Sequence, residues 1–331
     1  MDHFRIVRRA LETTWRYRAL WLFGVLLALT SRSGGNGGGG GSNVTLPGPE
    51  NMFPGLDVAG PPVWLILVIV GVIVVLAFAF AIISVVVRYL SENALIKMVD
   101  EREETGTEHG IRGGFRLAWS RSAWRFFLID LVIFTPTILL FIVGLLLGAS
   151  PLLLWITRRQ ALGVVGTIIA IGLIFLVVLF FIAVFIALSL LRHMFLRVVA
   201  LEGEGVFGAI REGFQLVRRH VGDVILMGLI MFGLGIAFTL LTIPVMIALV
   251  VLGLLAGGVP ALLMAGLASL VSEGALPWIV GIAVGLPLFL LVFGLPALFL
   301  GGLYETFKST LWTLTYRELR AMELGVEAEA R

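Results

Sequence analysis

Six long apolar stretches constrain the fold of this chain more than any other feature of its sequence. Hydrophobic residues make up 59% of the 331 residues and charged residues only 14%, which leaves too little polar surface for a soluble protein. About 20 apolar residues cross the ~30 Å hydrocarbon core of a bilayer as a helix, and lipid offers no partner for an open strand edge. The sequence therefore predicts an all-α integral membrane protein with six transmembrane helices, over residues 19–31, 62–87, 126–148, 163–191, 224–257 and 277–303.

The basic residues are sorted between the polar segments that separate these stretches. Of the 24 Lys and Arg residues, 21 lie in every other segment: residues 1–18, 88–125, 192–222 and 304–331. The remaining three lie in the intervening segments and are Arg32, Arg158 and Arg159. Because short loops rich in Lys and Arg stay in the cytoplasm, this alternation predicts that the N-terminus and the C-terminus are both cytoplasmic.

The composition also bears on the partners of the chain. Nucleic acid is not expected, since the basic residues lie at the edges of the apolar stretches and are interleaved with acidic ones. The absence of cysteine excludes disulfides and thiolate metal sites. Arginine binds phosphate through paired hydrogen bonds, so the excess of Arg over Lys is compatible with anionic phospholipid headgroups as partners, besides the bilayer itself. A GC-rich genome gives the same excess and is the account of it that we favour. A protein partner or a homo-oligomer is a further alternative.

An internal repeat divides the chain into three units. Residues 112–117 (R-G-G-F-R-L) match 211–216 (R-E-G-F-Q-L), and residues 144–154 match 253–263 in a shared G-L-L-x-G-x-x-P-x-L-L frame. The first third of the chain is a degenerate third copy. We predict one membrane domain over residues 1–323, in which each unit has a basic amphipathic helix and two spans, with units of about 1–87, 88–191 and 192–303 and a cytoplasmic helix over 304–323.

Three further segments are not expected to cross the membrane. Residues 32–61 are rich in Gly and Pro and predict a flexible extracytoplasmic loop. Residues 258–272 are apolar but too short and Pro-interrupted for a crossing; they lie along the outer interface or re-enter the membrane, and we favour the interface. Residues 324–331 are predicted to be a disordered tail.

The basic amphipathic helices predict contact with the membrane surface. Phe4, Val7, Leu11 and Trp15 share one helix face at steps of three and four, and such helices lie in the headgroup plane with the apolar face toward the lipid. These helices either anchor the spans that follow them, which we favour, or sense lipid or dock a partner. The predicted interfacial lipid contacts are Arg8, Arg9, Trp15, Arg116, Arg121, Trp124, Arg211, Arg218 and Arg219.

Few residues are candidates for chemistry. Asp130 is the strongest, since it lies about one turn inside an apolar stretch and five residues after Arg125, with which it could pair. A structural carboxylate near the positive end of a helix dipole is the account of Asp130 that we favour over a functional one. The sequence contains no paired-histidine metal motif, nucleophile elbow or P-loop. It therefore predicts no catalytic residue, no cofactor and no metal site.

Pro136 and Pro244 interrupt spans at matching places in the second and third units. Paired helix breaks mark binding sites in transporters, but nearby threonines can satisfy the freed carbonyls within their own helices, so we favour a role in packing. Glycines spaced four apart predict close helix contacts in these spans: Gly144 and Gly148, Gly253 and Gly257, and Gly281 and Gly285.

Two motifs carry a resemblance to a known group of proteins. They are the G-F-x-L helix before each span and the C-terminal residues 312–319, W-T-L-T-Y-R-E-L. Over most of residues 1–323 the chain resembles uncharacterised bacterial polytopic proteins related to the membrane domain of glycerophosphoryl diester phosphodiesterase. The resemblance implies an integral domain of the bacterial cytoplasmic membrane, close to phospholipid metabolism. It carries over no catalytic residue, because in the fused enzymes catalysis belongs to a separate soluble barrel.

The predicted spans have no charged residue at their middle, and basic amphipathic helices precede them. Together these two features favour a non-enzymatic scaffold or regulatory protein that acts at the cytoplasmic membrane face. The alternative is a transporter or a lipid-translocating protein, which the repeat and the paired helix breaks would suit. A polar cavity lined by both proline-broken helices would favour that alternative. An intramembrane enzyme would need converging ionisable groups, which the sequence does not indicate.

Overall fold

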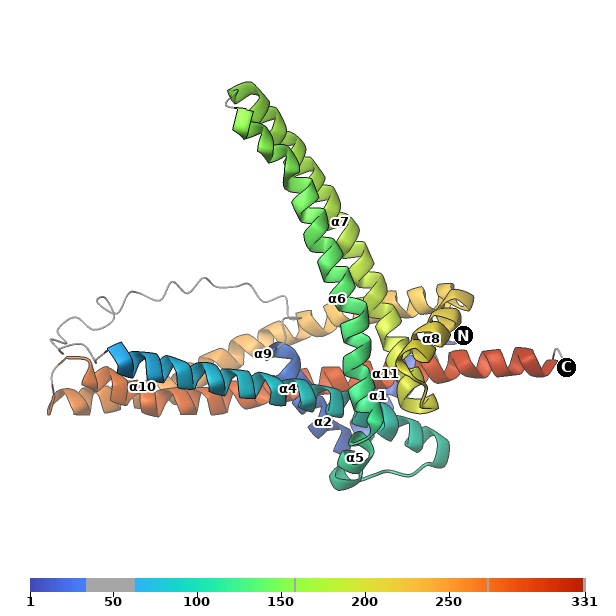
Figure 1. Cartoon of the computed structure of the whole chain (residues 1–331). Coiled ribbons are helices and arrows are strands. Elements are labelled where there is room, and N and C mark those ends of the chain that lie inside the picture. The colour runs from blue at the N-terminus through green and yellow to red at the C-terminus, as the bar shows by residue number, and fades with distance from the viewer. Residues whose placement is uncertain (34–62, 158, 273, 330–331) are drawn as a thin grey trace.

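The computed structural model describes residues 1–33, 63–157, 159–272 and 274–329, which are helical almost throughout and contain no strand (Figure 1). A short helix is followed by two further helical segments three times along the chain, although in the first third the segment after the short helix, α2, has only 15 residues. The elements are α1 (His3–Arg16), α2 (Ala19–Ser33), α4 (Val63–Thr105), α5 (Ile111–Ala118), α6 (Arg121–Ala149), η1 (Ser150–Thr157), α7 (Gln160–Arg197), η2 (Val198–Glu202), α8 (Val206–Arg219), α9 (Val221–Ser269), α10 (Leu276–Phe289), η3 (Leu290–Gly294) and α11 (Leu295–Glu329).

Five helical runs are long and apolar enough to cross a membrane. They contain α4, α6, α7, α9 and the run from α10 to α11. The sixth predicted span, residues 19–31, falls in α2, whose 15 residues extend about 22 Å, less than the ~30 Å hydrocarbon core. α2 lies between α4 and α11, and its side chains Leu20 and Phe23 are fully buried. The crossing by α2 therefore stays a prediction.

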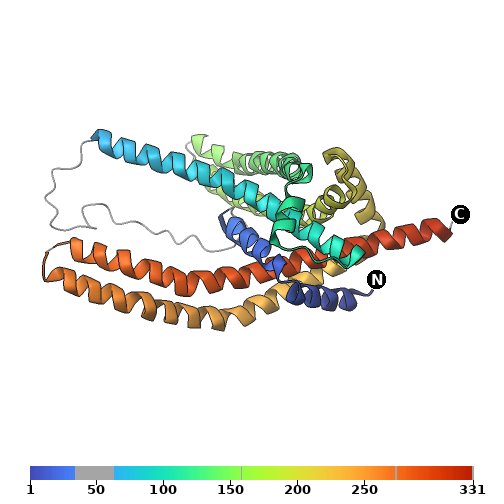
Figure 2. The same ribbon diagram turned by 90° about the horizontal axis from the view of Figure 1, so that it is seen from below.

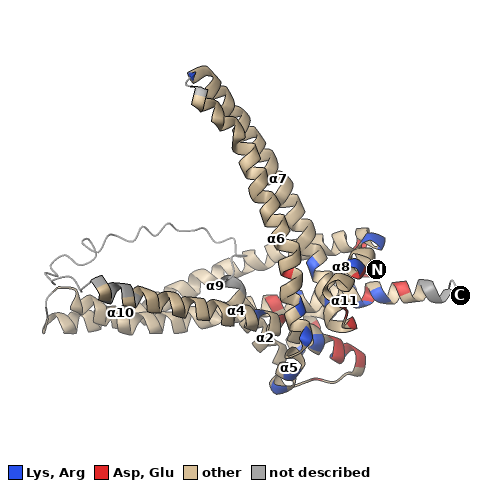
Figure 3. Ribbon diagram, in the orientation of Figure 1, with Lys and Arg blue, Asp and Glu red and all other residues tan. Residues whose placement is uncertain are grey.

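The charged residues gather at one end of the molecule (Figure 3). We call this end the head; it is formed by α1, α5 and α8 with the adjoining ends of the long helices. Its core is built from the C-terminal parts of α4 and α7 and from the middle of α11, which contribute the fully buried Met98, Leu196 and Trp312 among others. Burying each such side chain contributes roughly 1.5–3 kcal/mol, so the head has the packed interior that the lipid-facing helices lack.

Two helical arms leave the head in different directions. α6 and α7 form a hairpin that diverges from α4 and from the hairpin of α9 with α10 and α11 (Figure 1). Figure 2 shows that α4 and α9–α11 extend from the head in one common direction. The side chains of both arms are largely exposed, as expected of surfaces that face hydrocarbon.

Threonine hydroxyls form hydrogen bonds near both proline breaks. The Thr137 hydroxyl donates to the Ile133 carbonyl at 2.8 Å beside Pro136, and the Thr242 hydroxyl donates to the Phe238 carbonyl at 2.6 Å beside Pro244. A proline removes one backbone donor and leaves the carbonyl four residues before it free, which is that of Val132 for Pro136 and that of Leu240 for Pro244. These two threonines therefore bond neighbouring carbonyls and not the freed ones, and the prediction that threonines satisfy the freed carbonyls is not confirmed by them.

Residues 258–269, which we predicted to be separate from the preceding span, instead continue α9 to Ser269, and their position relative to the outer interface stays a prediction. Small residues explain the difference. A Cβ atom on Gly257 would lie 2.5 Å from the Gly285 carbonyl oxygen, and one on Gly281 would lie 2.6 Å from the Ala261 carbonyl oxygen. The backbones of α9 and α10 thus approach closely, and this packing holds residues beyond Pro260 in the helix.

Two other predicted boundaries fall differently in the structure. The predicted cytoplasmic helix over 304–323 is not separate from the last span, since α11 runs unbroken from Leu295 to Glu329. α11 also enters the predicted disordered tail, of which residues 330 and 331 lie outside the described part. The predicted loop 32–61 lies outside the described residues except for its first two, which end α2.

The α9–α10 contact generates a direct test. Gly257→Val should destabilise the protein by about 1–3 kcal/mol, because the added carbons meet the backbone of α10. Gly258→Val is the matched control, since a Cβ at Gly258 has nothing within 4 Å. Thermal unfolding in detergent measures both. Equal melting temperatures for the two variants would contradict the close contact.

Candidate functional site

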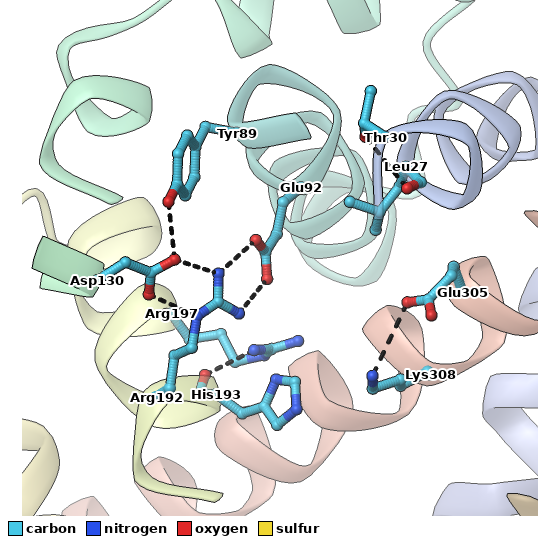
Figure 4. A network of polar contacts seen from close by, with 10 residues as sticks. All are labelled: Leu27, Thr30, Tyr89, Glu92, Asp130, Arg192, His193, Arg197, Glu305 and Lys308. Carbon is cyan, nitrogen blue, oxygen red and sulfur yellow. Dashed lines mark hydrogen bonds and ion pairs between the residues drawn. The ribbon is translucent and has the colours of Figure 1, made fainter. Parts of the chain in front are cut away.

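A cavity of about 570 Å³ lies where the arms meet the head. We call it the junction cavity; it is lined by residues of five helices, α2, α4, α6, α7 and α11 (Figure 4). Most of its polar lining follows directly after an apolar stretch: Arg88 follows residues 62–87, Arg192 follows 163–191 and Glu305 comes soon after 277–303. The cavity therefore lies at the boundary between the charged and the apolar parts of the molecule.

Arg192 of α7 organises one wall of the junction cavity. Its Nη1 and Nη2 atoms donate to the two carboxylate oxygens of Glu92, each at 2.9 Å. Its Nε atom donates to Asp130 Oδ1 at 2.6 Å and Nη2 donates to Asp130 Oδ2 at 3.0 Å. The Tyr89 hydroxyl also donates to Asp130 Oδ2, at 2.9 Å. One guanidinium thus links α4, α6 and α7.

The chemistry of arginine suits this position. Arg192 is only 9% exposed, so the charge is held away from water. A planar guanidinium can serve two carboxylates at once through its fixed fork of donors, which a lysine ammonium cannot do. Removing one partner from such a buried ion pair costs about 3–5 kcal/mol, because the remaining charge stays buried. The bridge therefore ties the three helices together at one depth.

The rest of the polar lining is less completely paired. Arg197 is 1% exposed and donates to the backbone carbonyls of His193 at 2.6 Å and Ser309 at 3.1 Å, and its Nε atom has no partner in the described part of the chain. Arg88 and Arg197 form no ion pair within the described residues. Lys308 lies 3.9 Å from Glu305, a loose contact. His193 stacks on Trp312 with ring centroids 5.0 Å apart, and its Nδ1 atom makes no hydrogen bond to a described residue.

The part of the cavity that faces the arms is apolar. Phe134 and Ile138 of α6, Phe185 of α7 and Leu27 of α2 line it. One compartment therefore combines cationic groups at the head with aromatic and aliphatic walls at the arm. That combination suits an amphiphile better than a fully polar or fully apolar ligand.

Asp130 belongs to this site, but its predicted partner does not. Arg125 instead donates to the backbone carbonyls of Gly203 and Glu204, at 2.5 and 3.0 Å, in the connection before α8. The pairing of Asp130 with Arg125 is therefore wrong, and Arg192 replaces Arg125 as the partner.

The two prolines are not brought together. Phe134 and Ile138, on either side of Pro136, line the junction cavity. Pro244 lies instead on α9, beside a second cavity of about 670 Å³ lined by Thr242 and Ile243 among others. The two cavities share only Glu305 in their linings. Neither of these two cavities is lined by both proline-broken helices, the arrangement that would favour a transporter.

The short helices α1, α5 and α8, one in each predicted unit, bury a small residue and expose the bulky residue that follows it. Gly114 of α5 and Gly213 of α8 face the head core, while the next residues, Phe115 and Phe214, are 43% and 50% exposed. A Cβ on Gly213 would lie 2.6 Å from the Phe195 ring, so the small residue is needed there. In α1, Ala10 is buried and the following Leu11 exposed. Each helix thus buries a small-residue stripe in the protein and presents bulky apolar side chains outward.

The predicted interfacial residues divide into three groups. Arg9 pairs with Glu103 of α4, and Arg219 pairs with Glu323 of α11 at 3.1 Å, so these two hold the head together. Arg8 pairs with Glu12 on its own helix at 3.1 Å. The others are exposed, with no ion pair in the described part of the chain, and remain predicted lipid contacts: Trp15, Arg116, Arg121, Trp124, Arg211 and Arg218.

Sequence reasoning missed Glu92, Arg192 and Arg197. Arg192 and Arg197 were counted only among the basic residues that predict on which side of the membrane each segment lies, and Glu92 was not singled out. A signal was present, because a charged residue follows closely on the last apolar residue of each returning helix. That common position predicts that these residues meet where the three returning helices converge.

Residues 4–314 match the model of a family of unknown function, DUF7544, and the chain belongs to this family. No curated protein and no solved structure matches the chain. The family match brings no link to glycerophosphoryl diester phosphodiesterase, so that resemblance stays a prediction. What the family match and the apolar helices establish together is a helical protein with several candidate membrane spans and no assigned activity.

The Arg192 bridge can be tested by removal and rescue. Arg192→Met should destabilise the protein by about 3–5 kcal/mol, because Glu92 and Asp130 are left buried without their cation. Adding Glu92→Gln and Asp130→Asn to Arg192→Met should recover part of this loss. Thermal unfolding and the yield of monodisperse protein measure both effects. A triple variant no more stable than Arg192→Met would contradict the bridge.

Proposed function

We propose that this protein is a non-enzymatic multi-pass protein of the bacterial cytoplasmic membrane, whose head acts at the cytoplasmic face as a scaffold or regulatory platform. The observation that carries the proposal is the Arg192 bridge, in which the carboxylates of Glu92 and Asp130, with side chains 10% and 14% exposed, join helices. Both carboxylates are bound by a structural partner. Such a joint suits a protein that holds its parts in a fixed arrangement.

Ion pairs across the head support a rigid platform. Arg320 of α11 contacts Glu202 at 3.0 Å and Glu212 of α8 at 2.6 Å, and Arg5 of α1 contacts Glu318 at 3.1 Å. Exposed pairs contribute no more than about 1 kcal/mol each, so their main effect is on geometry. They orient α1 and α8 on α11 and thereby fix which faces of these helices point outward.

The outward faces support a head that rests on the membrane. Phe4 and Trp15 of α1, Trp119 beside α5 and Phe207 of α8 are between 68% and 82% exposed. Bulky apolar side chains next to exposed arginines are typical of interfacial helices that lie on anionic bilayers. Three such helices, one in each predicted unit, would hold the head flat against the cytoplasmic leaflet and leave the end of α11 free for a protein partner or a second copy.

A transporter or lipid-translocating protein is the second candidate, and the junction cavity is the observation that favours it. Its cationic and apolar lining suits an amphiphile. Translocation would also need a polar path toward the other leaflet. The described residues of the arms include no charged side chain before Arg159 at the far tip of the α6–α7 hairpin (Figure 3), and the two proline breaks lie beside different cavities. We therefore place scaffolding first.

The topology on which the proposal depends can be measured directly, since the chain has no cysteine. Single cysteines at the exposed Ser150 and Ser269, at the far ends of the arms, should react with an impermeant maleimide in intact cells. Cysteines at the exposed Thr107 and Leu324 of the head should react only after the cells are opened. Labelling of the head from outside would reverse the proposed orientation.

The scaffold role predicts contacts at the head and none at the arm tips. A photocrosslinking amino acid at Glu104 or Leu324, both exposed, should yield a discrete crosslinked protein species in living cells. The matched positions Leu270 and Val271, at the tip of the α9–α10 hairpin and 81% and 90% exposed, should not. Crosslinks absent from the head under these conditions would contradict a scaffold.

A further inference from the structure

We propose that the junction cavity binds the phosphate-bearing headgroup of an anionic phospholipid, with its apolar wall contacting the acyl chains. This ligand site is separate from the surface contacts predicted for the short helices, and it goes beyond the scaffold function. It is argued from the charge balance of the cavity, from its unpartnered cations, from its depth and from its two-sided lining.

The charge balance leaves the cavity cationic. Its lining has four cationic side chains, Arg88, Arg192, Arg197 and Lys308, and three carboxylates, Glu92, Asp130 and Glu305. With His193 counted as neutral, the cavity carries one net positive charge. Arg192 binds both Glu92 and Asp130, so this bridge carries one net negative charge, and the net positive charge of the cavity comes from Arg88, Arg197 and Lys308. A phosphate diester with one negative charge would balance the cavity.

The unpartnered donors indicate where that phosphate would sit. The Nε atoms of Arg88 and Arg197 are buried and make no hydrogen bond within the described residues, and neither guanidinium has an ion-pair partner there. A buried donor that makes no hydrogen bond costs more free energy than a typical hydrogen bond contributes. Figure 4 shows Glu305 and Lys308 of α11 facing Arg197 and His193 of α7 across open space. A phosphate between these helices would meet cations from both sides.

The depth of the cavity favours a lipid over a soluble phosphate compound. Its cationic residues begin where the apolar stretches end, which is the level of phospholipid headgroups for a chain that spans the bilayer. Its other wall, Phe134, Ile138 and Phe185, belongs to the arm that diverges from the rest of the bundle. A free phosphate or a sugar phosphate would leave these aromatic and aliphatic groups unused, whereas a lipid covers them with its chains.

The size of the cavity agrees with a headgroup. About 570 Å³ lies within the range of roughly 300–1,000 Å³ typical of small-molecule sites. Arginine is the side chain that binds phosphate oxygens in pairs, and the cavity presents three arginines from two helices.

The test is a lipid titration of the full-length protein in a neutral detergent, followed by thermal unfolding. Dioleoylphosphatidylglycerol should raise the melting temperature in a saturable manner, and dioleoylphosphatidylcholine at the same concentrations should not. Inorganic phosphate and glycerophosphoglycerol are the soluble control compounds, and they should give no saturable shift of the melting temperature. Stabilisation by either soluble compound equal to that by phosphatidylglycerol would overturn the assignment to a lipid.

Variants assign the effect to this cavity. Arg88→Gln and Lys308→Gln should each weaken the apparent affinity for phosphatidylglycerol roughly tenfold, the loss expected for one hydrogen bond to a charged group. Arg112→Gln is the matched control, since it removes the same charge from an exposed position of the head outside the cavity, and it should bind as the unaltered protein does. An equal loss in Arg112→Gln would show that only the overall charge of the head matters and would overturn the site.

A second variant, which fills the cavity without changing its charge, keeps the proposal testable if a charge variant fails to fold. Ser189→Phe adds bulk to the cavity lining at an exposed position and changes no charge. It should abolish the shift with phosphatidylglycerol while the protein without lipid unfolds as before. Wild-type affinity in both Ser189→Phe and Lys308→Gln would overturn the proposal, even if Arg88→Gln failed to fold.

Discussion

The buried bridge of Arg192 with Glu92 and Asp130 is the interaction on which the arrangement of the helices depends. Three charged groups at about a tenth exposure are costly to desolvate, and they are retained because each satisfies the others. The bridge joins α4 of the first predicted unit to α6 and α7 of the second. Hydrocarbon-facing helices have no hydrophobic drive to associate with one another, so the head, with this bridge at its edge, determines where the arms begin.

Much of the fold could be predicted from the sequence, because apolar length and charge sorting act on whole segments. Five of the predicted spans correspond to helices long enough to cross, and the basic segments gather in one head. The partner of Asp130 could not be predicted in the same way. Residues five apart on a helix point about 140° away from each other, so Arg125 could not face Asp130. Its true partner lies 62 residues away on α7, a pairing set by tertiary packing.

The continuation of α9 through residues 258–269 shows a second limit of sequence reasoning. Length and Pro260 favour an end to the helix, but stability here comes from backbone contact with α10 at Gly257, Gly281 and Gly285. The glycine spacing predicts that close contacts occur in these spans. It does not say which residues face each other, and this pairing decides that the helix continues past the proline.

The short helices explain why an amphipathic pattern alone is ambiguous. Each helix has two neighbouring stripes of residues without polar side chains. One stripe is made of small buried residues such as Ala10, Gly114 and Gly213, and the other of bulky exposed residues such as Leu11, Phe115 and Phe214. The small stripe can approach a packed core closely, and the bulky stripe gains most from lipid. A helix with both stripes suits a position between a packed core and a membrane surface. Three such helices around one head therefore support the proposed position of that head at the bilayer surface, with the junction cavity at the proposed depth of the lipid headgroups.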